Sequence, residues 1–126
     1  MAENQQKLQS LSNEYQQLQD DLQTTIAARQ KLESQQEENR AVQKEFKTLS
    51  NDSNIYKLVG PVLLKQDRDD AKRTVDGRLE FIGKEIKRVE ATIKELQEKG
   101  EKMRGELAAL QQKVQMEQQS GAGKGA

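Results

Sequence analysis

The fold is decided by the stretch Asn54-Ile-Tyr-Lys-Leu-Val-Gly-Pro-Val-Leu-Leu-Lys-Gln66, which differs from everything around it. Two runs of β-branched and apolar residues, 55–59 and 62–64, flank Gly60-Pro61 and have the length of short strands. Pro61 is the only proline, and residues 1–59 contain no glycine. The stretch therefore predicts a β-hairpin at residues 54–66 that reverses the chain near its centre.

The segment before the hairpin, about residues 4–50, has the pattern of a long amphipathic helix. It is rich in Gln, Glu, Lys and Leu, and its apolar positions alternate steps of three and four residues, which is the seam of a heptad repeat. The seam positions are Leu8, Leu11, Tyr15, Leu18, Leu22, Thr25, Arg29, Leu32, Gln36, Asn39, Gln43 and Phe46. Val42 and Leu49 fall outside this register, so we expect a register shift near residue 40.

The segment after the hairpin, about residues 69–119, repeats the pattern without interruption. Its seam positions are Val75, Leu79, Ile82, Ile86, Val89, Ile93, Leu96, Gly100, Met103, Leu107, Leu110 and Val114. All but Gly100 are apolar, and six unbroken heptads strongly favour a coiled coil. Asp67 or Asp69 offers an N-cap for this helix. A glutamate precedes a lysine at the spacing that favours an ion pair at Glu80–Lys84, Glu90–Lys94, Glu95–Lys99 and Glu98–Lys102.

Two helices of similar length joined by a short reversal pair antiparallel. The predicted fold class is therefore all-α dominated: a long two-helix coiled coil with one central β-hairpin, in one domain spanning residues 1–126, with a flexible tail at 120–126. The pairing places Phe46 and Leu49 near Val75 and Leu79, Leu8 and Leu11 near Val114, and Gly100 near Thr25. Polar seam residues Arg29, Gln36 and Asn39 cost stability but help to fix the register.

The predicted hairpin is apolar on both faces, which two helices alone do not cover. An isolated two-stranded hairpin is marginally stable in water, and its two open edges invite pairing with other strands. We therefore expect it to pair with hairpins of other chains in a closed sheet. The residues expected to carry this oligomerisation are Ile55, Tyr56, Leu58, Val59, Val62, Leu63 and Leu64.

The composition argues against an enzyme. The chain has no cysteine and no histidine, so it lacks the commonest nucleophilic, general-base and metal-ligating side chains. Adjacent carboxylates at 37–38 and 69–70 are typical of solvated helix surface, and the Gly-rich end at 121–126 lacks the strand and the Ser or Thr of a phosphate-binding loop. We expect no catalytic residue, no metal and no cofactor.

Charge and hydropathy also limit the partners. The 21 basic and 21 acidic residues balance, and Lys84, Lys87 and Arg88 are interleaved with glutamates, so no nucleic-acid partner is expected. No apolar run approaches the ~20 residues of a membrane span, and no signal peptide follows Met1, so we expect no membrane association and a cytoplasmic location.

Apolar residues at the two chain ends are the candidates for binding other proteins. Helix ends fray, and nothing beyond Val114 covers the last turns of the pair. The side chains expected to face outward are Leu8, Leu11, Leu107, Leu110, Val114 and Met116.

A known family shares these features. The hairpin stretch 54–66, the following segment Arg73-Thr-Val-Asp-Gly-Arg-Leu-Glu-Phe-Ile82, and the earlier Tyr15-Gln-Gln-Leu-Gln19 and Arg29-Gln-Lys-Leu-Glu33 together resemble β-type subunits of prefoldin, in particular those of eukaryotes. The resemblance covers nearly the whole chain, and the hairpin is its specific part.

The resemblance implies a heterohexameric chaperone of two α-type and four β-type subunits whose hairpins form a double β-barrel. It implies that the ends of the coiled coils hold non-native client proteins, actin and tubulin among them. It also implies transfer of these clients to the group II chaperonin without use of ATP. The alternative is a structural coiled-coil scaffold or tether without clients, which explains the helices but not strands that are apolar on both faces.

Overall fold

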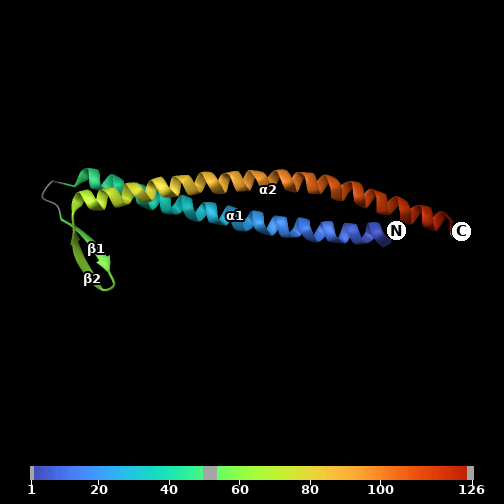
Figure 1. Ribbon diagram of the computed structural model, residues 1–126, viewed down its shortest axis with the longest axis horizontal. Helices are drawn as coiled ribbons and strands as arrows, with labels where there is room; N and C mark the ends of the chain where they lie inside the picture. Colours follow the sequence, from blue (N-terminus) through green and yellow to red (C-terminus); the bar gives the residue numbers. More distant parts are fainter. Residues whose placement is uncertain (1, 50–53, 125–126) are drawn as a thin grey trace. The chain divides into compact units, whose positions relative to one another are not determined.

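The computed structural model describes residues 2–49 and 54–124. Its elements follow the order α1 (Ala2–Thr48), β1 (Ile55–Val59), β2 (Val62–Gln66) and α2 (Arg68–Lys124) (Figure 1). The predicted fold class, two long helices and one antiparallel hairpin, is confirmed. Helix α2 runs through Lys124, past the predicted end at residue 119.

The start of α2 is fixed by Asp67, one of the two residues predicted as its N-cap. The Asp67 carboxylate oxygen Oδ1 accepts hydrogen bonds from the backbone N–H groups of Asp69 at 2.8 Å and Asp70 at 3.2 Å. These are donors that a helix leaves without an intrahelical partner in its first turn. The hairpin therefore passes into α2 after a single residue.

The end of α1 is held by Arg68, the first residue of α2. Its guanidinium nitrogen Nη2 donates to the backbone carbonyl oxygens of Phe46 at 3.2 Å and Leu49 at 2.9 Å. The last carbonyl groups of a helix have no intrahelical partner and carry partial negative charge, so a cation is favourable there. The first predicted helix included Ser50, which lies outside the described residues.

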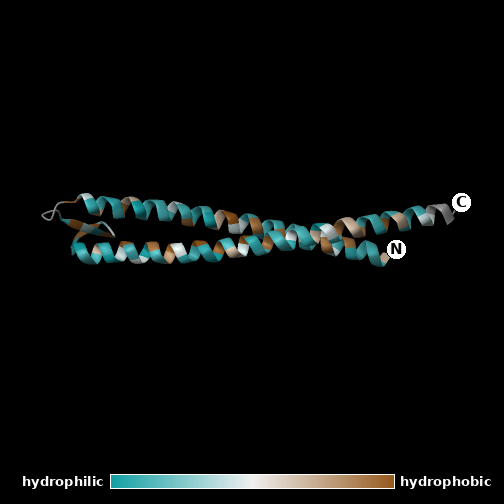
Figure 2. Ribbon diagram, turned by 90° about the horizontal axis from the view of Figure 1, so that it is seen from above, coloured by the Kyte–Doolittle hydropathy of each residue, from teal (hydrophilic) through white to brown (hydrophobic). Residues whose placement is uncertain are grey.

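The chain forms two compact units. The central unit, Ala28–Glu90, contains the hairpin with the adjoining parts of both helices, and the terminal unit consists of Met1–Ala27 and Ala91–Ala126. Every seam position predicted from the heptads is buried or half-buried. Figure 2 shows the corresponding hydrophobic residues at intervals along α2 rather than in a continuous block.

Antiparallel pairing is visible within the central unit. Gln43 donates to the Asp76 carboxylate at 2.9 Å, and Arg29 donates to the Glu90 carboxylate at 3.0 Å, so the partner number rises as the α1 number falls. The original register continues past residue 40, because Val42 is exposed while the seam residue Gln43 is half-buried; of the two residues outside that register, only Leu49 is half-buried. The side-chain hydrogen bond to Asp76 makes the polar residue acceptable at the seam.

In the terminal unit, Leu18 packs against Gly100. A Cβ atom on Gly100 would lie 3.3 Å from Leu18 Cδ2 and 3.7 Å from Gln19 Nε2, so the predicted neighbour, Thr25, is wrong. The error is one heptad. Apolar positions recur every seven residues, so the pattern determines which face is buried but not which heptads meet.

Candidate functional site

The hairpin has a tight two-residue turn that the sequence predicts. Val59 pairs with Val62, and Gly60 between them has a φ of 60°. A positive φ at the first central position is the mark of a type II′ turn, which prefers glycine there, and the fixed φ of Pro61 suits the second position. The turn thereby sets the register that places Leu58 opposite Leu63.

Both faces of the hairpin are exposed. One face carries Leu58, which is 68 % exposed, beside its cross-strand partner Leu63, and the other carries Val62, which is 53 % exposed, beside Val59. Tyr56 and Leu64 are exposed as well, and the predicted oligomerisation residue Ile55 is half-buried. The chain thus covers neither face of its own sheet, which would be costly for so many apolar side chains in an isolated protein.

The two edges of the hairpin also have hydrogen-bonding capacity. In an antiparallel hairpin closed by a two-residue turn, the residues flanking the turn exchange both backbone hydrogen bonds, and every second pair along the strands does the same. The alternate residues, Tyr56 and Leu58 on β1 with Leu63 and Lys65 on β2, then direct their N–H and C=O groups outward. Each edge therefore offers two residues for pairing with another strand.

The terminal unit holds the other predicted site residues. Leu8, Leu11, Leu107 and Leu110 are half-buried, Val114 is only 7 % exposed, and Met116 is 63 % exposed. Leu11 and Leu110 share an open groove of about 520 Å³ whose rim carries charged side chains, among them Lys7 and Glu14. Of the six residues, Met116 is the most exposed and Val114 is the one that is buried.

A polar contact joins the two helices in the same unit. The side-chain amide of Asn4 donates to Glu117, which links the first turn of α1 to α2 beyond Val114. The pair therefore extends past the last apolar seam position, and it helps to keep Val114 enclosed.

The charged surface is organised by ion pairs. Of the four predicted Glu–Lys pairs, all within the described part of α2, only Glu80 and Lys84 form an ion pair, at 3.4 Å. Arg88 binds Glu85 at 2.9 Å. The hydrogen bond from Arg88, aided by its positive charge, lowers the pKa of the Glu85 carboxyl from its ordinary value. Two of the three basic residues noted in the sequence, Lys84 and Arg88, are thus each paired with a glutamate.

A polar seam residue joins the helices in the central unit. Arg29 lies between Glu90, which its Nη2 reaches at 3.0 Å, and Glu33, whose carboxylate is 3.1 Å from its Nε. This ion pair fixes one register of α1 against α2, as polar groups at coiled-coil seams do.

Neither a metal site nor a membrane helix is apparent in the part of the chain that is described. Within residues 2–49 and 54–124, no three His, Cys, Asp or Glu side chains come together in a way that could hold a metal ion. No helix in the same ranges is long and apolar enough to cross a membrane.

One exposed aromatic residue of α2 was not among the predicted site residues. Phe81 lies next to the seam residue Ile82 on α2, yet it is 64 % exposed and lines an open pocket with Gly77 and Arg78. Its exposure could have been predicted from the sequence, because Phe81 lies outside the heptad seam. It also follows Gly77, a glycine in the middle of a helix, by four residues.

The chain matches the family model described as "Prefoldin subunit" over residues 9–114. It is 44 % identical to prefoldin subunit 6 of Bos taurus over 119 residues, which cover 94 % of this chain and 92 % of the relative. It is 50 % identical to prefoldin subunit 6 of Saccharomyces cerevisiae over 103 residues, with coverages of 82 % and 90 %.

A solved structure agrees with these relatives at the level of the fold. The prefoldin beta subunit of Thermococcus strain KS-1 superimposes with a TM-score of 0.75 at 24 % identity, covering 82 % of this chain and 92 % of that one. The resemblance to β-type subunits inferred from the hairpin is therefore confirmed. The chain belongs to the prefoldin family and is a subunit of a prefoldin chaperone complex.

Proposed function

We propose that this chain is a β-type subunit of a cytoplasmic heterohexamer that holds non-native proteins without ATP and passes them to the group II chaperonin. The partners are α-type and other β-type prefoldin subunits, and the clients include actin and tubulin. The observation that carries the proposal is a sheet exposed on both faces, because such a surface in a prefoldin subunit calls for partner hairpins.

Assembly is assigned to the hairpin. Pairing at its two edges would extend the ladder into a sheet of several subunits, and closure of that sheet into a β-barrel would bury one face of every hairpin. The face that turns inward would carry either Tyr56, Leu58 and Leu63 or Ile55, Val59, Val62 and Leu64, and all seven residues are assigned to this assembly.

Client binding is assigned to the ends of the helices in the terminal unit. Leu8, Leu11, Leu107 and Leu110 are half-buried and Met116 is exposed, so these side chains offer weak apolar contacts rather than a deep pocket. Val114 joins them when the last turns separate. Several subunits acting together would give useful affinity through multivalency while each single contact remains easy to release.

The assembly claim is tested by replacing Val59 and Leu63 with Asp, one on each face of the hairpin. The helices should keep their circular dichroism, while incorporation into the complex, measured by native mass spectrometry with the other subunits, should be abolished. The matched control places two Asp residues at exposed Gln23 and Gln30 of α1. Normal incorporation of the hairpin variant would refute the assembly role.

The holdase claim is tested with the assembled complex and an unfolding client. Light scattering should show suppressed aggregation in the absence of ATP if the complex holds non-native chains. A structural scaffold or tether would leave aggregation unchanged, and that result would decide for the alternative function.

A further inference from the structure

Phe81 is an exposed aromatic ring in the central unit for which the heptad pattern gives no reason. Ile82 beside it is buried at the seam, whereas Phe81 is 64 % exposed. An aromatic side chain contributes a large apolar area when it is buried, and such residues are enriched at protein interfaces.

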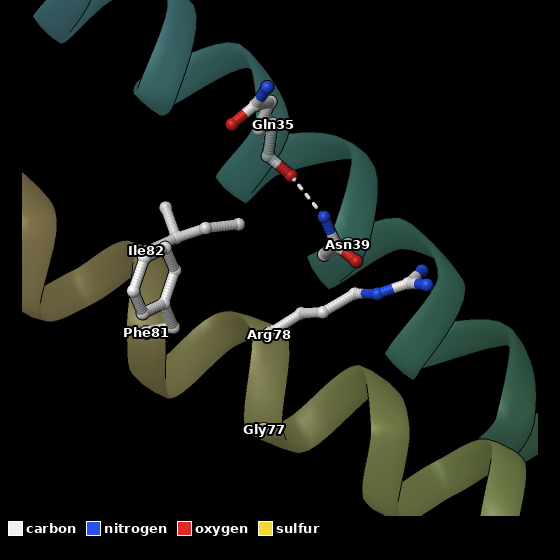
Figure 3. Close-up of a pocket in the computed structure, with 6 residues that line it drawn as sticks. All are labelled: Gln35, Asn39, Gly77, Arg78, Phe81 and Ile82. Atoms are coloured by element: carbon white, nitrogen blue, oxygen red, sulfur yellow. Dashed lines mark hydrogen bonds between the residues drawn. The ribbon is translucent and has the colours of Figure 1, made fainter.

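The surroundings of Phe81 form a built recess rather than a flat surface. The pocket, of about 490 Å³, is lined on α2 by Gly77, Arg78, Phe81 and Ile82 and on α1 by Gln35 and Asn39. Figure 3 shows Phe81 on one side of Gly77 and Arg78 extending toward α1. Because Gly77 has no side chain and a Cβ there would meet nothing within 4 Å, the recess stays open.

The recess shares one wall residue with a cavity at the hairpin. Arg78 also lines a second cavity, of about 300 Å³, together with Tyr56, Lys57 and Val75. Arg78 therefore lies between the hairpin on one side and Phe81 on the other. It forms no hydrogen bond or ion pair with any residue in the described ranges 2–49 and 54–124, so its positive charge is free to meet a carboxylate.

We propose that Tyr56, Arg78, Phe81 and the gap at Gly77 form a second docking strip for the neighbouring prefoldin subunit, which continues the hairpin interface onto α2. The occupant is a segment of that subunit with an apolar side chain that enters the gap at Gly77 and a carboxylate that pairs with Arg78. This inference rests on the proposed role of the hairpin in assembly.

A neighbouring subunit is favoured over a client because the strip begins on the hairpin. A chain that pairs with an edge of the hairpin is already held next to Arg78, so contact there adds little further loss of freedom. Tyrosine and arginine dominate the energetics of stable interfaces, and here they are joined to an exposed phenylalanine.

The test uses two glycine substitutions that are alike in the single chain. Gly77 and Gly105 are both exposed in α2, and a Cβ at either position meets nothing within 4 Å. Gly77→Leu and Gly105→Leu should both raise the melting temperature of the full chain, since leucine is a far better helix former than glycine. Only Gly77→Leu places a side chain in the recess.

In competition with the unmodified chain for the other prefoldin subunits, Gly77→Leu should be incorporated about tenfold less than Gly105→Leu, as expected for a blocked hot spot. Phe81→Ala, which removes an exposed side chain and leaves no cavity, should also be incorporated less than the unmodified chain. Equal incorporation of all three would overturn the proposal. So would full incorporation of Gly77→Leu with weaker client protection, which would assign the recess to clients.

The Val59→Asp, Leu63→Asp variant in the same competition separates the two claims. If that variant is excluded while Gly77→Leu enters freely, only the docking strip is refuted. If the hairpin variant itself enters freely, the proposed role of the hairpin fails.

Discussion

At the scale of single residues, Gly100 shows how close approach is balanced against helix stability. Gly100 is buried against Leu18, the one buried side chain recorded for α1, and an added Cβ would come within 3.3 Å of its Cδ2. Glycine in a helix interior costs about 1 kcal/mol relative to alanine, so the contact has to offset that cost.

The Gly100 contact predicts unequal effects for two alanine substitutions. Gly105→Ala should stabilise the chain by about 0.5–1 kcal/mol, because nothing surrounds its Cβ position. Gly100→Ala should gain less, since the end of Leu18 has to move by a few tenths of an ångström. Denaturant unfolding followed by circular dichroism measures both, and an equal gain would show that Leu18 does not restrict this position.

The Arg88 and Glu85 pair predicts a shifted titration. Glu85 should protonate below the ordinary pH for a glutamate because Arg88 donates a hydrogen bond to it and attracts its charge. A lowered pKa in the folded state stabilises the fold above the unfolded pKa, and this contribution disappears as pH falls through the folded value. The pair is exposed, so the effect on stability is small. NMR titration of the Glu85 carboxyl should show the shift, and Arg88→Ala should abolish it.

At the scale of the helices and the hairpin, the sequence predicted most of the architecture. The two heptad seams identified the faces that are buried, and Gly60-Pro61 identified the turn, because periodicity and turn chemistry are local properties. The sequence could not predict that Leu18 lies opposite Gly100. A seven-residue repeat looks the same after a shift of one heptad, so it does not show which heptads of the two helices meet. The predicted register shift near residue 40 rested partly on the assumption that Val42, an apolar residue outside the register, is buried.

The recess beside Phe81 was missed for a related reason. Its walls come from both helices, with Asn39 on α1 and Gly77 on α2 among them. The recess therefore depends on which heptads of α1 and α2 meet, and the repeat does not determine that pairing. The surface of the hairpin was easier to predict, because strand alternation alone places Leu58 and Val59 on opposite faces.

The seam of α2 predicts graded losses on truncation to alanine. Ile93 is buried and Ile86 is half-buried, so Ile93→Ala should cost about 2–3 kcal/mol and Ile86→Ala less, near the lower end for such substitutions. Thermal unfolding of the two variants beside the unmodified chain measures the difference. A larger loss at Ile86 would mean that exposure in the single chain does not reflect its packing in solution.

At the scale of the whole molecule, the distribution of apolar surface separates two tasks. Along the helices, apolar side chains are mostly enclosed at the seam, whereas Leu58, Leu63 and their neighbours on the hairpin are open to solvent. Under the proposed function, this exposed surface of the central unit is the one that other subunits would cover. Under the proposed function, Met116 and the half-buried leucines of the terminal unit would make brief contacts with client chains.

The last prediction concerns these terminal residues in the assembled complex. Deleting residues 1–11 together with 113–126 removes Leu8, Leu11, Val114 and Met116 but leaves the hairpin and most of both seams. The truncated chain should therefore still assemble, yet protect an unfolding client less well. Native mass spectrometry checks assembly, and light scattering checks protection.

A point variant makes this test specific. Fully burying a methionine side chain is worth about 1.5–3 kcal/mol, and a contact that stays partly hydrated gives less, so Met116→Ser alone should weaken protection modestly. Because Met116 is exposed, the substitution leaves no cavity, and the poorer helix propensity of serine should lower the melting temperature only slightly. If complexes with the truncation protect the client as well as intact ones, binding cannot lie at these ends. The recess beside Phe81 or the other subunits would then have to hold the client.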